Sequence, residues 1–364
     1  MTEKYSYQFV DSNLMAGWSD DGTHVSWMNP FTGEETPGAE IENLFRTLIE
    51  KPDEITEDFI STLNRIFFYY LRDMRNGDFD FFFKEETSGR ASLLYQFRRA
   101  DDYIRSSASE RKRLYDLLEN DDEDGSGRPE ISEENALKIK SHYISLMPTR
   151  IFEQSLLLLR LDPVLLHAPE GNSFILGPCP MNIINPYFSG RHPEGSEGYE
   201  EELCGACLIM PVTPTTAFCL YDPDIYRFRK KGGKCMLTPH DVEVLNMIQI
   251  YNGGKDYGFV YKGDGDNLRS AIGRLGNHDD WKNYEESDSY PFPTDLSLCL
   301  VKAGAEENFS SYYDDPYAKF VQEMQKYDQD SFARKLTPEY DYGKERHRRF
   351  VFAHNYLFEH EIEE

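Results

Sequence analysis

The chain has 364 residues, of which 39% are hydrophobic and 14% aromatic, so it holds enough apolar material for a sizeable core and is not disordered as a whole. Its 65 acidic and 39 basic residues give a formal net charge of −26, and such a surface repels phosphate backbones, which argues against a nucleic-acid partner. The length allows two domains or one large one.

The acidic surface suits a basic protein partner, or it lets this chain itself mimic a nucleic acid, although a solvated acidic surface gives the same composition. No run of about 18 apolar residues predicts a membrane-spanning helix, and the N-terminal residues do not follow the pattern of a signal peptide. Six cysteines in such a chain favour reduced thiols over a disulfide framework. We therefore expect a cytoplasmic protein, with no membrane contact and no cofactor.

The first part of the chain predicts short strands followed by helices. Residues 1–38 are rich in aromatics and glycine, with turns at Asp21-Gly22 and Thr32-Gly33. Beyond them, apolar residues recur at helical spacing, and the four aromatics at 67–70 are typical of a helix core. Helices are expected over residues 38–51 and 53–77, and two helices or one bent helix over 89–120. After an acidic loop over 121–130, a long helix is expected from about Ser132 to 160, kinked at Pro148.

The second part of the chain alternates short apolar runs with turn formers, which predicts a sheet. One helix interrupts the runs over 238–254, with Pro239 near its start and Gly253 at its end. The expected strands cover residues 162–168, 172–177, 181–185, 206–212, 216–222, 257–263 and 296–301, and further helices are expected around 316–327 and 344–360.

These patterns together predict an α+β fold. We expect a mostly helical N-terminal part with short strands over residues 1–160, and a mixed α/β part with a mainly antiparallel sheet over residues 161–364. The two parts are also compatible with one continuous domain.

Cys204 and Cys207 have the spacing of a metal-binding pair. A tetrahedral zinc site needs two further thiolate or imidazole ligands, and no other cysteine or histidine pairs at a matching spacing. Cys207 also lies in an apolar run, where a cysteine commonly packs as a small hydrophobic residue. We therefore expect no metal, with these two cysteines as the weak candidates.

Two basic clusters stand out against the acidic composition, one over residues 227–234 and one over 344–349. Concentrated positive charge binds either a phosphate-bearing ligand or an acidic patch of a second protein, but a solvated surface that balances nearby carboxylates has the same composition.

Three stretches in a fixed order resemble a bacterial and phage family known as the domain-of-unknown-function 4238 family. "FILGPCPM" is similar to the family's Phe-Ile-Thr-Ser-Asp-Asn-Pro-Val strand, "MPVTPTTAFCLYD" to its Pro-Leu-Ser-Pro turn, and "VEVLNMIQIYN" to its helix with a paired Asn and Gln. The resemblance covers about residues 175–260.

The chain departs from this family pattern at its most polar place, where Gly177 and Pro178 replace Ser and Asp. If the Asp of the family pattern acts as a general base or binds a cation, this chain has lost that function. If that Asp only caps a turn, Gly-Pro builds the same bend in another way. The resemblance leaves both alternatives open.

Two hypotheses for the function follow. The first is a binding or interaction protein, with a basic protein as its partner and a defence-associated or toxin-neutralising role. The second is an enzyme that acts on a nucleotide or another small phosphate-bearing molecule. The site residues in either case are Arg227, Arg229 and Lys231, which bear the positive charge, and the cleft residues His240, Asn246 and Gln249.

Overall fold

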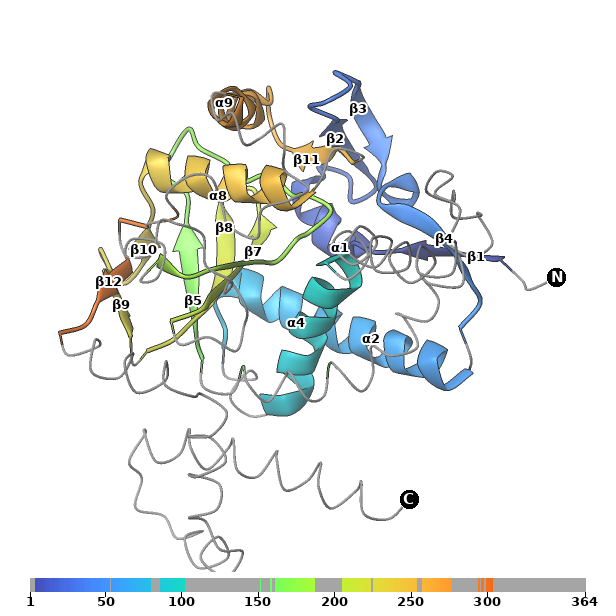
Figure 1. Ribbon diagram of the computed structural model, residues 1–364, viewed down its shortest axis with the longest axis horizontal. Coiled ribbons are helices and arrows are strands. Elements are labelled where there is room, and N and C mark those ends of the chain that lie inside the picture. The colour runs from blue at the N-terminus through green and yellow to red at the C-terminus, as the bar shows by residue number, and fades with distance from the viewer. Residues whose placement is uncertain are drawn as a thin grey trace, which may run out of the picture.

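The computed structural model describes residues 4–52, 54–79, 86–101, 151, 158, 161–186, 205–223, 225–253, 257–276, 294, 296–297 and 299–303 (Figure 1). The predictions for the 121–130 loop, for the helices around 132–160, 316–327 and 344–360, for the 344–349 basic cluster and for Cys204 fall largely or wholly outside these residues.

The largest sheet has five strands in the order β10-β5-β8-β7-β6. Its pairs are antiparallel except β10–β5, so the expected antiparallel sheet is confirmed. β7 and β8 have buried residues at nearly every position, which is why they read as continuous apolar runs in the sequence. The strands are β5 (Asp162–His167), β6 (Asn182–Ile184), β7 (Cys207–Thr213), β8 (Thr216–Tyr221) and β10 (Cys235–Met236).

Three smaller sheets complete the described strands. They are β1 (Lys4–Gln8) with β4 (Arg46–Glu50), β11 (Phe259–Tyr261) with β2 (His24–Met28) and β3 (Glu35–Glu40), and β12 (Cys299–Val301) with β9 (Tyr226–Phe228). Gly22 and Gly33 have φ angles of 81° and 72°, so the two expected turns lie where glycine is favoured.

Helices surround these sheets. α8 runs across the five-stranded sheet and α9 lies beyond it, while α2 and α4 cross each other beside the same sheet (Figure 1). The helical elements are α1 (Ser12–Met15), η1 (Ala16–Trp18), η2 (Ile41–Asn43), α2 (Glu54–Asn76), α4 (Glu86–Asp101), α8 (Pro239–Gly253) and α9 (Asp266–Leu275).

The α+β class is confirmed, but the mostly helical N-terminal part is wrong, because residues 4–50 form mainly strands. The expected helix at 38–51 is instead the short helix η2 followed by strand β4. Ile41 and Phe45 are buried as the helical stripe required, yet Leu48 is 46% exposed. Phe45 has a φ of 52°, which a helix does not allow, and the following residues pair with β1.

The buried apolar side chains form one cluster that includes residues on both sides of position 160, from Tyr7 to Leu296. Among the described residues, no helix is both long and apolar enough to cross a membrane.

Candidate functional site

Asn246 of α8 holds the stretch that resembles the family's first motif. Its side-chain oxygen accepts a hydrogen bond from the backbone N–H of Ile175 at 3.0 Å, and its side-chain nitrogen donates to the backbone oxygen of Ser173 at 2.9 Å. Asn246 is 1% exposed. Its amide therefore replaces a neighbouring strand as the partner of this backbone.

Gln249 does the same one helical turn later. It accepts from the N–H of Gly177 at 2.9 Å and donates to the backbone oxygen of Pro180 at 3.0 Å. Among the described residues, the stretch at 172–177 pairs with a strand only through Leu176, in a single bridge to Val260. The expected strand at 172–177 is therefore wrong, because two side-chain amides take the hydrogen bonds that a strand would give to a sheet.

The space around Gly177 explains the glycine where the family pattern has a polar residue. A Cβ at this position would lie 2.8 Å from the ring of Phe259 and 3.0 Å from the Gln249 side-chain oxygen. Gly177 thus allows a close approach between the loop, α8 and β11. In this chain the Gly-Pro stretch is part of the packed core.

Asp241 fixes the start of α8. It is fully buried, and Thr238 and Ser297 each donate to it through a backbone N–H and a hydroxyl, over distances of 2.6–2.8 Å. The N–H of Asp241 in turn donates to the Thr238 hydroxyl, which completes a capping box. The neighbouring His240 is exposed and has its Nδ1 3.4 Å from Arg274 of α9.

The basic cluster at 227–234 lies on β9 and on the tight turn between β9 and β10. Lys231 and Lys234 pair through their backbones across Gly232 and Gly233, which both have positive φ angles. All of its charged side chains are exposed, and none forms an ion pair with a carboxylate of the described residues: Arg227, Arg229, Lys230, Lys231 and Lys234.

The proposed site residues therefore do not share one environment. Asn246 and Gln249 are buried and bonded to backbone, His240 is exposed beside α9, and the arginines and lysines are exposed on the β9–β10 side. A role for them in ligand binding stays a prediction.

Cys207 lies in β7, and burial raises the pKa of its thiol well above the ordinary value, with contributions from the neighbouring thiol of Cys219. A thiol in this state is neutral and packs as a small apolar group. The five described cysteines form no disulfide with one another, and the described residues contain no group of three or more metal-ligating side chains.

A cavity of about 250 Å³ is lined by residues of β1, β4, α2 and the end of α4, and we call it the β1–α4 cavity. Of these elements, β1 and β4 lie on the side of the molecule away from β9 and β10 (Figure 1). The cavity was not foreseen from the sequence. Its lining is mostly polar and consists of Tyr5, Ser6, Tyr7, Gln8, Asp11, Ser12, Arg46, Pro52, Glu57, Ile60, Asn64 and Arg99.

Arg99 of α4 builds the wall of this cavity. The residue is 2% exposed and donates to the backbone oxygens of Phe9 and Gln8 at 2.8 and 2.9 Å and to the side-chain oxygen of Asn64 at 2.9 Å. Its guanidinium also lies 5.3 Å from the centre of the Tyr95 ring. These bonds tie β1, α2 and α4 together around the cavity.

A pair of tyrosines and one carboxylate lie beside Arg99. The hydroxyls of Tyr7 and Tyr95 are 2.8 Å apart, and burial raises the pKa of both groups. Asp11 caps α1, because one of its oxygens accepts from the N–H groups of Asn13 and Leu14 at 2.8 and 3.2 Å.

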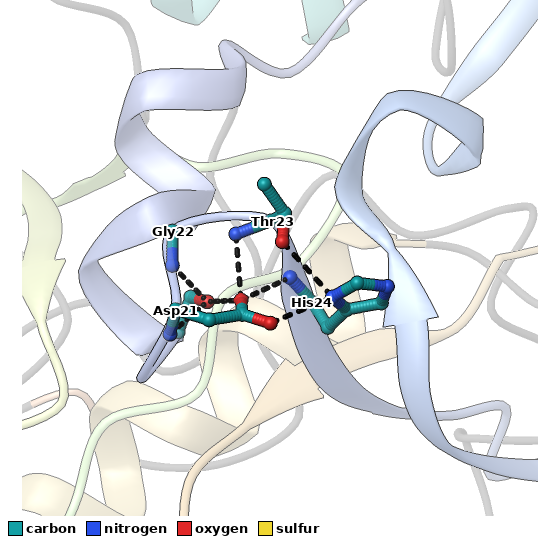
Figure 2. A network of polar contacts seen from close by, with 5 residues as sticks. Asp21, Gly22, Thr23 and His24 are labelled. Atoms are coloured by element: carbon teal, nitrogen blue, oxygen red, sulfur yellow. Dashed lines mark hydrogen bonds and ion pairs between the residues drawn. The ribbon is translucent and has the colours of Figure 1, made fainter.

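A second polar network lies in the turn between η1 and β2 (Figure 2). One oxygen of Asp21 accepts from the N–H groups of Thr23 and His24, both at 2.8 Å, and from the hydroxyl of Ser19 at 2.9 Å. Its other oxygen lies 2.7 Å from Nδ1 of His24. These bonds hold the pKa of Asp21 well below its usual range, and they shape an exposed turn.

Sequence reasoning missed the β1–α4 cavity because its residues come from four separate segments. One signal was present in α4, where the polar residues Gln96 and Arg99 follow the apolar residues Leu93 and Leu94 and are both buried. A buried arginine on the core side of a helix needs several acceptors, so it marks a place where backbones converge.

The fold and the cavity define an α+β protein with a polar site between its N-terminal strands and its first long helices. The model of a family described as a protein of unknown function, DUF4238, matches residues 40–264. The chain belongs to this family, so the resemblance seen in the sequence is confirmed. No curated protein and no solved structure matched the chain.

Proposed function

We propose that this protein acts by binding, and that the β1–α4 cavity holds a small polar ligand. One observation carries the proposal: Arg99 fixes the cavity wall by hydrogen bonds to Gln8, Phe9 and Asn64. A wall that is already ordered needs no rearrangement to bind, which favours affinity. We place this activity in the cytoplasm, where cysteine thiols stay reduced.

Native mass spectrometry of protein purified from its own host, without added ligand, tests this proposal. Ile60 lines the cavity, so Ile60→Trp fills it, whereas Ile66→Trp adds the same bulk to a partly buried position of α2 outside it. We expect a bound small-molecule mass in the wild type and in Ile66→Trp and its loss in Ile60→Trp. A bare chain in all three, or a mass that Ile60→Trp retains, contradicts the proposal.

The net charge of −26 favours a second proposal, which is that a basic protein is the physiological partner. A defence-associated or toxin-neutralising role would use such a surface. Attraction between opposite surfaces weakens with salt, so we expect a partner captured at about 0.05 M salt to be released by about 0.5 M. Capture that does not change with salt contradicts this proposal.

The exposed basic cluster supports the enzymatic alternative, in which Arg227, Arg229 and Lys231 hold a phosphate-bearing small molecule. Nucleotide binding that is lost in Arg227→Ala and Arg229→Ala, but kept in Ile60→Trp, would favour this alternative over the cavity.

A further inference from the structure

We propose that the basic cluster at 227–234 and the exposed apolar side chains beside it form a docking surface for an anionic lipid membrane. Lipid headgroups supply anionic oxygens for the cations, and the boundary of the acyl chains accepts apolar side chains. The sequence led us to expect no membrane contact because it predicts no spanning helix, and a contact with the lipid surface needs none. This surface is separate from the β1–α4 cavity.

Lys231 and Lys234 form an unfavourable pair of like charges. Their backbones exchange two hydrogen bonds, of 2.8 and 3.2 Å, across the turn formed by Gly232 and Gly233. Residues directly opposite each other in an antiparallel pair have their side chains on the same face, where like charges destabilise the pairing. An anionic surface that contacts both lysines offsets this repulsion.

No carboxylate of the described residues compensates the charge of the cluster. From residue 225 to 240 the sequence has five basic residues and no Asp or Glu. The described carboxylates nearest along the chain, Asp222 and Asp241, are 4% and 0% exposed, so they do not reach the surface. The positive charge also affects His167, whose pKa is lowered first by burial and then by Lys234. The cluster is therefore a region of uncompensated positive charge.

Exposed apolar side chains lie beside these cations. Met236 of β10 follows the turn and is 38% exposed, and Val301 of β12 is 42% exposed. β12 pairs with β9, with Leu300 directly opposite Arg227 and Val301 opposite Tyr226. Cationic and apolar side chains thus occur together, which is the combination that holds peripheral proteins at the headgroup region of a membrane.

A membrane matches this surface better than other anionic partners. The exposed cations extend from β9 through the turn to β10, and a single phosphate group is too small to contact them all. A nucleic acid offers a row of phosphates but no apolar phase for Met236 and Val301. A membrane is both extended and bounded by an apolar phase, so it satisfies the two kinds of side chain at once.

The net charge of −26 does not prevent this contact at physiological salt. At about 0.15 M ionic strength the Debye length is about 8 Å, so charges farther than this from the headgroups are largely screened. β9 and β10 lie on the side of the molecule away from β1 and β4 (Figure 1). The side chains at the contact therefore decide the interaction, and those of the basic cluster are positive.

Co-sedimentation of the full chain with lipid vesicles tests the proposal. The probes are vesicles of phosphatidylglycerol mixed with phosphatidylcholine, and vesicles of phosphatidylcholine alone. At about 0.15 M salt we expect binding to the first and not to the second, and at about 0.5 M salt we expect the binding to weaken strongly. No binding to the anionic vesicles at the lower salt concentration overturns the proposal.

A double variant locates the contact. Lys231→Gln with Lys234→Gln removes two cations, each of which contributes about fivefold to affinity for an anionic surface, so binding should weaken roughly 25-fold. The variant should melt no lower than the wild type, because the like-charge pair is gone. Lys51→Gln with Arg65→Gln, at two exposed positions, gives the same net charge and should bind like the wild type. Equal binding by the two double variants overturns the proposal.

Met236→Gln tests the apolar part of the contact, because it removes an exposed apolar side chain and leaves every charge in place. We expect severalfold weaker binding to the anionic vesicles. Leu48→Gln is the matched control, since Leu48 is 46% exposed on β4, and it should bind like the wild type. If Met236→Gln also binds like the wild type, apolar side chains do not enter the membrane and the proposal is wrong.

Two further probes separate a membrane from other anions. Inorganic phosphate, added at constant ionic strength, should not displace the chain from the vesicles, and displacement would assign the surface to free phosphate instead. Binding to poly-glutamate without binding to the vesicles would assign it to an acidic protein segment. Either result overturns the lipid proposal. Ile60→Trp should bind the vesicles like the wild type, so the cavity and this surface are tested separately.

Discussion

Gln249 uses its buried amide to satisfy the backbone of Gly177 and Pro180, so its removal should cost stability. Gln249→Ala leaves one donor and one acceptor unpaired in the core, and each such group costs about 1–3 kcal/mol. We expect the free energy of unfolding to fall by about 2–4 kcal/mol in urea denaturation. Thr62→Ala, at an exposed position of α2, should change it by less than about 0.5 kcal/mol. A similar loss in both variants would contradict the role of the amide.

Replacing Gly177 and replacing Gly273 by alanine should change the free energy of unfolding in opposite directions. A Cβ at Gly177 meets Phe259 at 2.8 Å, so Gly177→Ala should lower the free energy of unfolding by about 1–3 kcal/mol. A Cβ at Gly273 of α9 meets nothing within 4 Å, so Gly273→Ala should raise it by about 0.5–1 kcal/mol. Equal effects of the two changes would show that the Gly-Pro stretch can shift away from Phe259.

The turn between η1 and β2 depends on the ionised form of Asp21 (Figure 2). The N–H groups of Thr23 and His24 are the main cause of its lowered pKa. As the pH falls to about 4, Asp21 takes up a proton in the unfolded chain but stays ionised in the folded chain. The stabilisation is fully present above that pH and is lost as the pH falls through the folded pKa.

Asp21→Asn tests this dependence. We expect the difference in unfolding free energy between wild type and variant to be constant above about pH 5 and to shrink below about pH 4. Urea denaturation at a series of pH values measures it. A difference that stays constant down to pH 3 would mean that Asp21 is not ionised in the folded turn.

At the scale of elements, the sequence correctly predicted the helices and strands whose apolar pattern fits only one type of element. β7 and β8 are buried on both faces, and α8 begins at Pro239 and ends at Gly253, as their residue patterns indicate. The pattern at 41–48 does not distinguish a helix from the observed η2 and β4, because Ile41 and Phe45 would be buried in the helix and are buried in the structure. The strand partner β1, which lies more than 30 residues away, decides between the two.

The candidate site was harder to predict than the fold. Asn246 and Gln249 were identified as polar residues inside an apolar helix, but their partners lie about 70 residues earlier in the chain. Arg99, Tyr7 and Asp11 meet only because α4 packs against β1. Local periodicity contains no information on such contacts, so the β1–α4 cavity follows from the tertiary structure alone.

Over the whole molecule, two of the strands that line the cavity, β1 and β4, lie far from the strands β9 and β10 that flank the basic cluster (Figure 1). A small ligand in the cavity would therefore not touch the basic cluster. A variant at one of the two sites should leave binding at the other site unchanged.

The net charge of −26 should make the folded chain repel itself, and single charge reversals can measure this. Lys231→Glu and Glu42→Lys change exposed side chains that form no ion pair among the described residues, and each shifts the net charge by two in opposite directions. At low salt we expect the first to lower the melting temperature and the second to raise it. In about 1 M salt, where the Debye length is about 3 Å, both should melt like the wild type. If both reversals lower the melting temperature at low salt, local contacts outweigh the repulsion of the whole molecule.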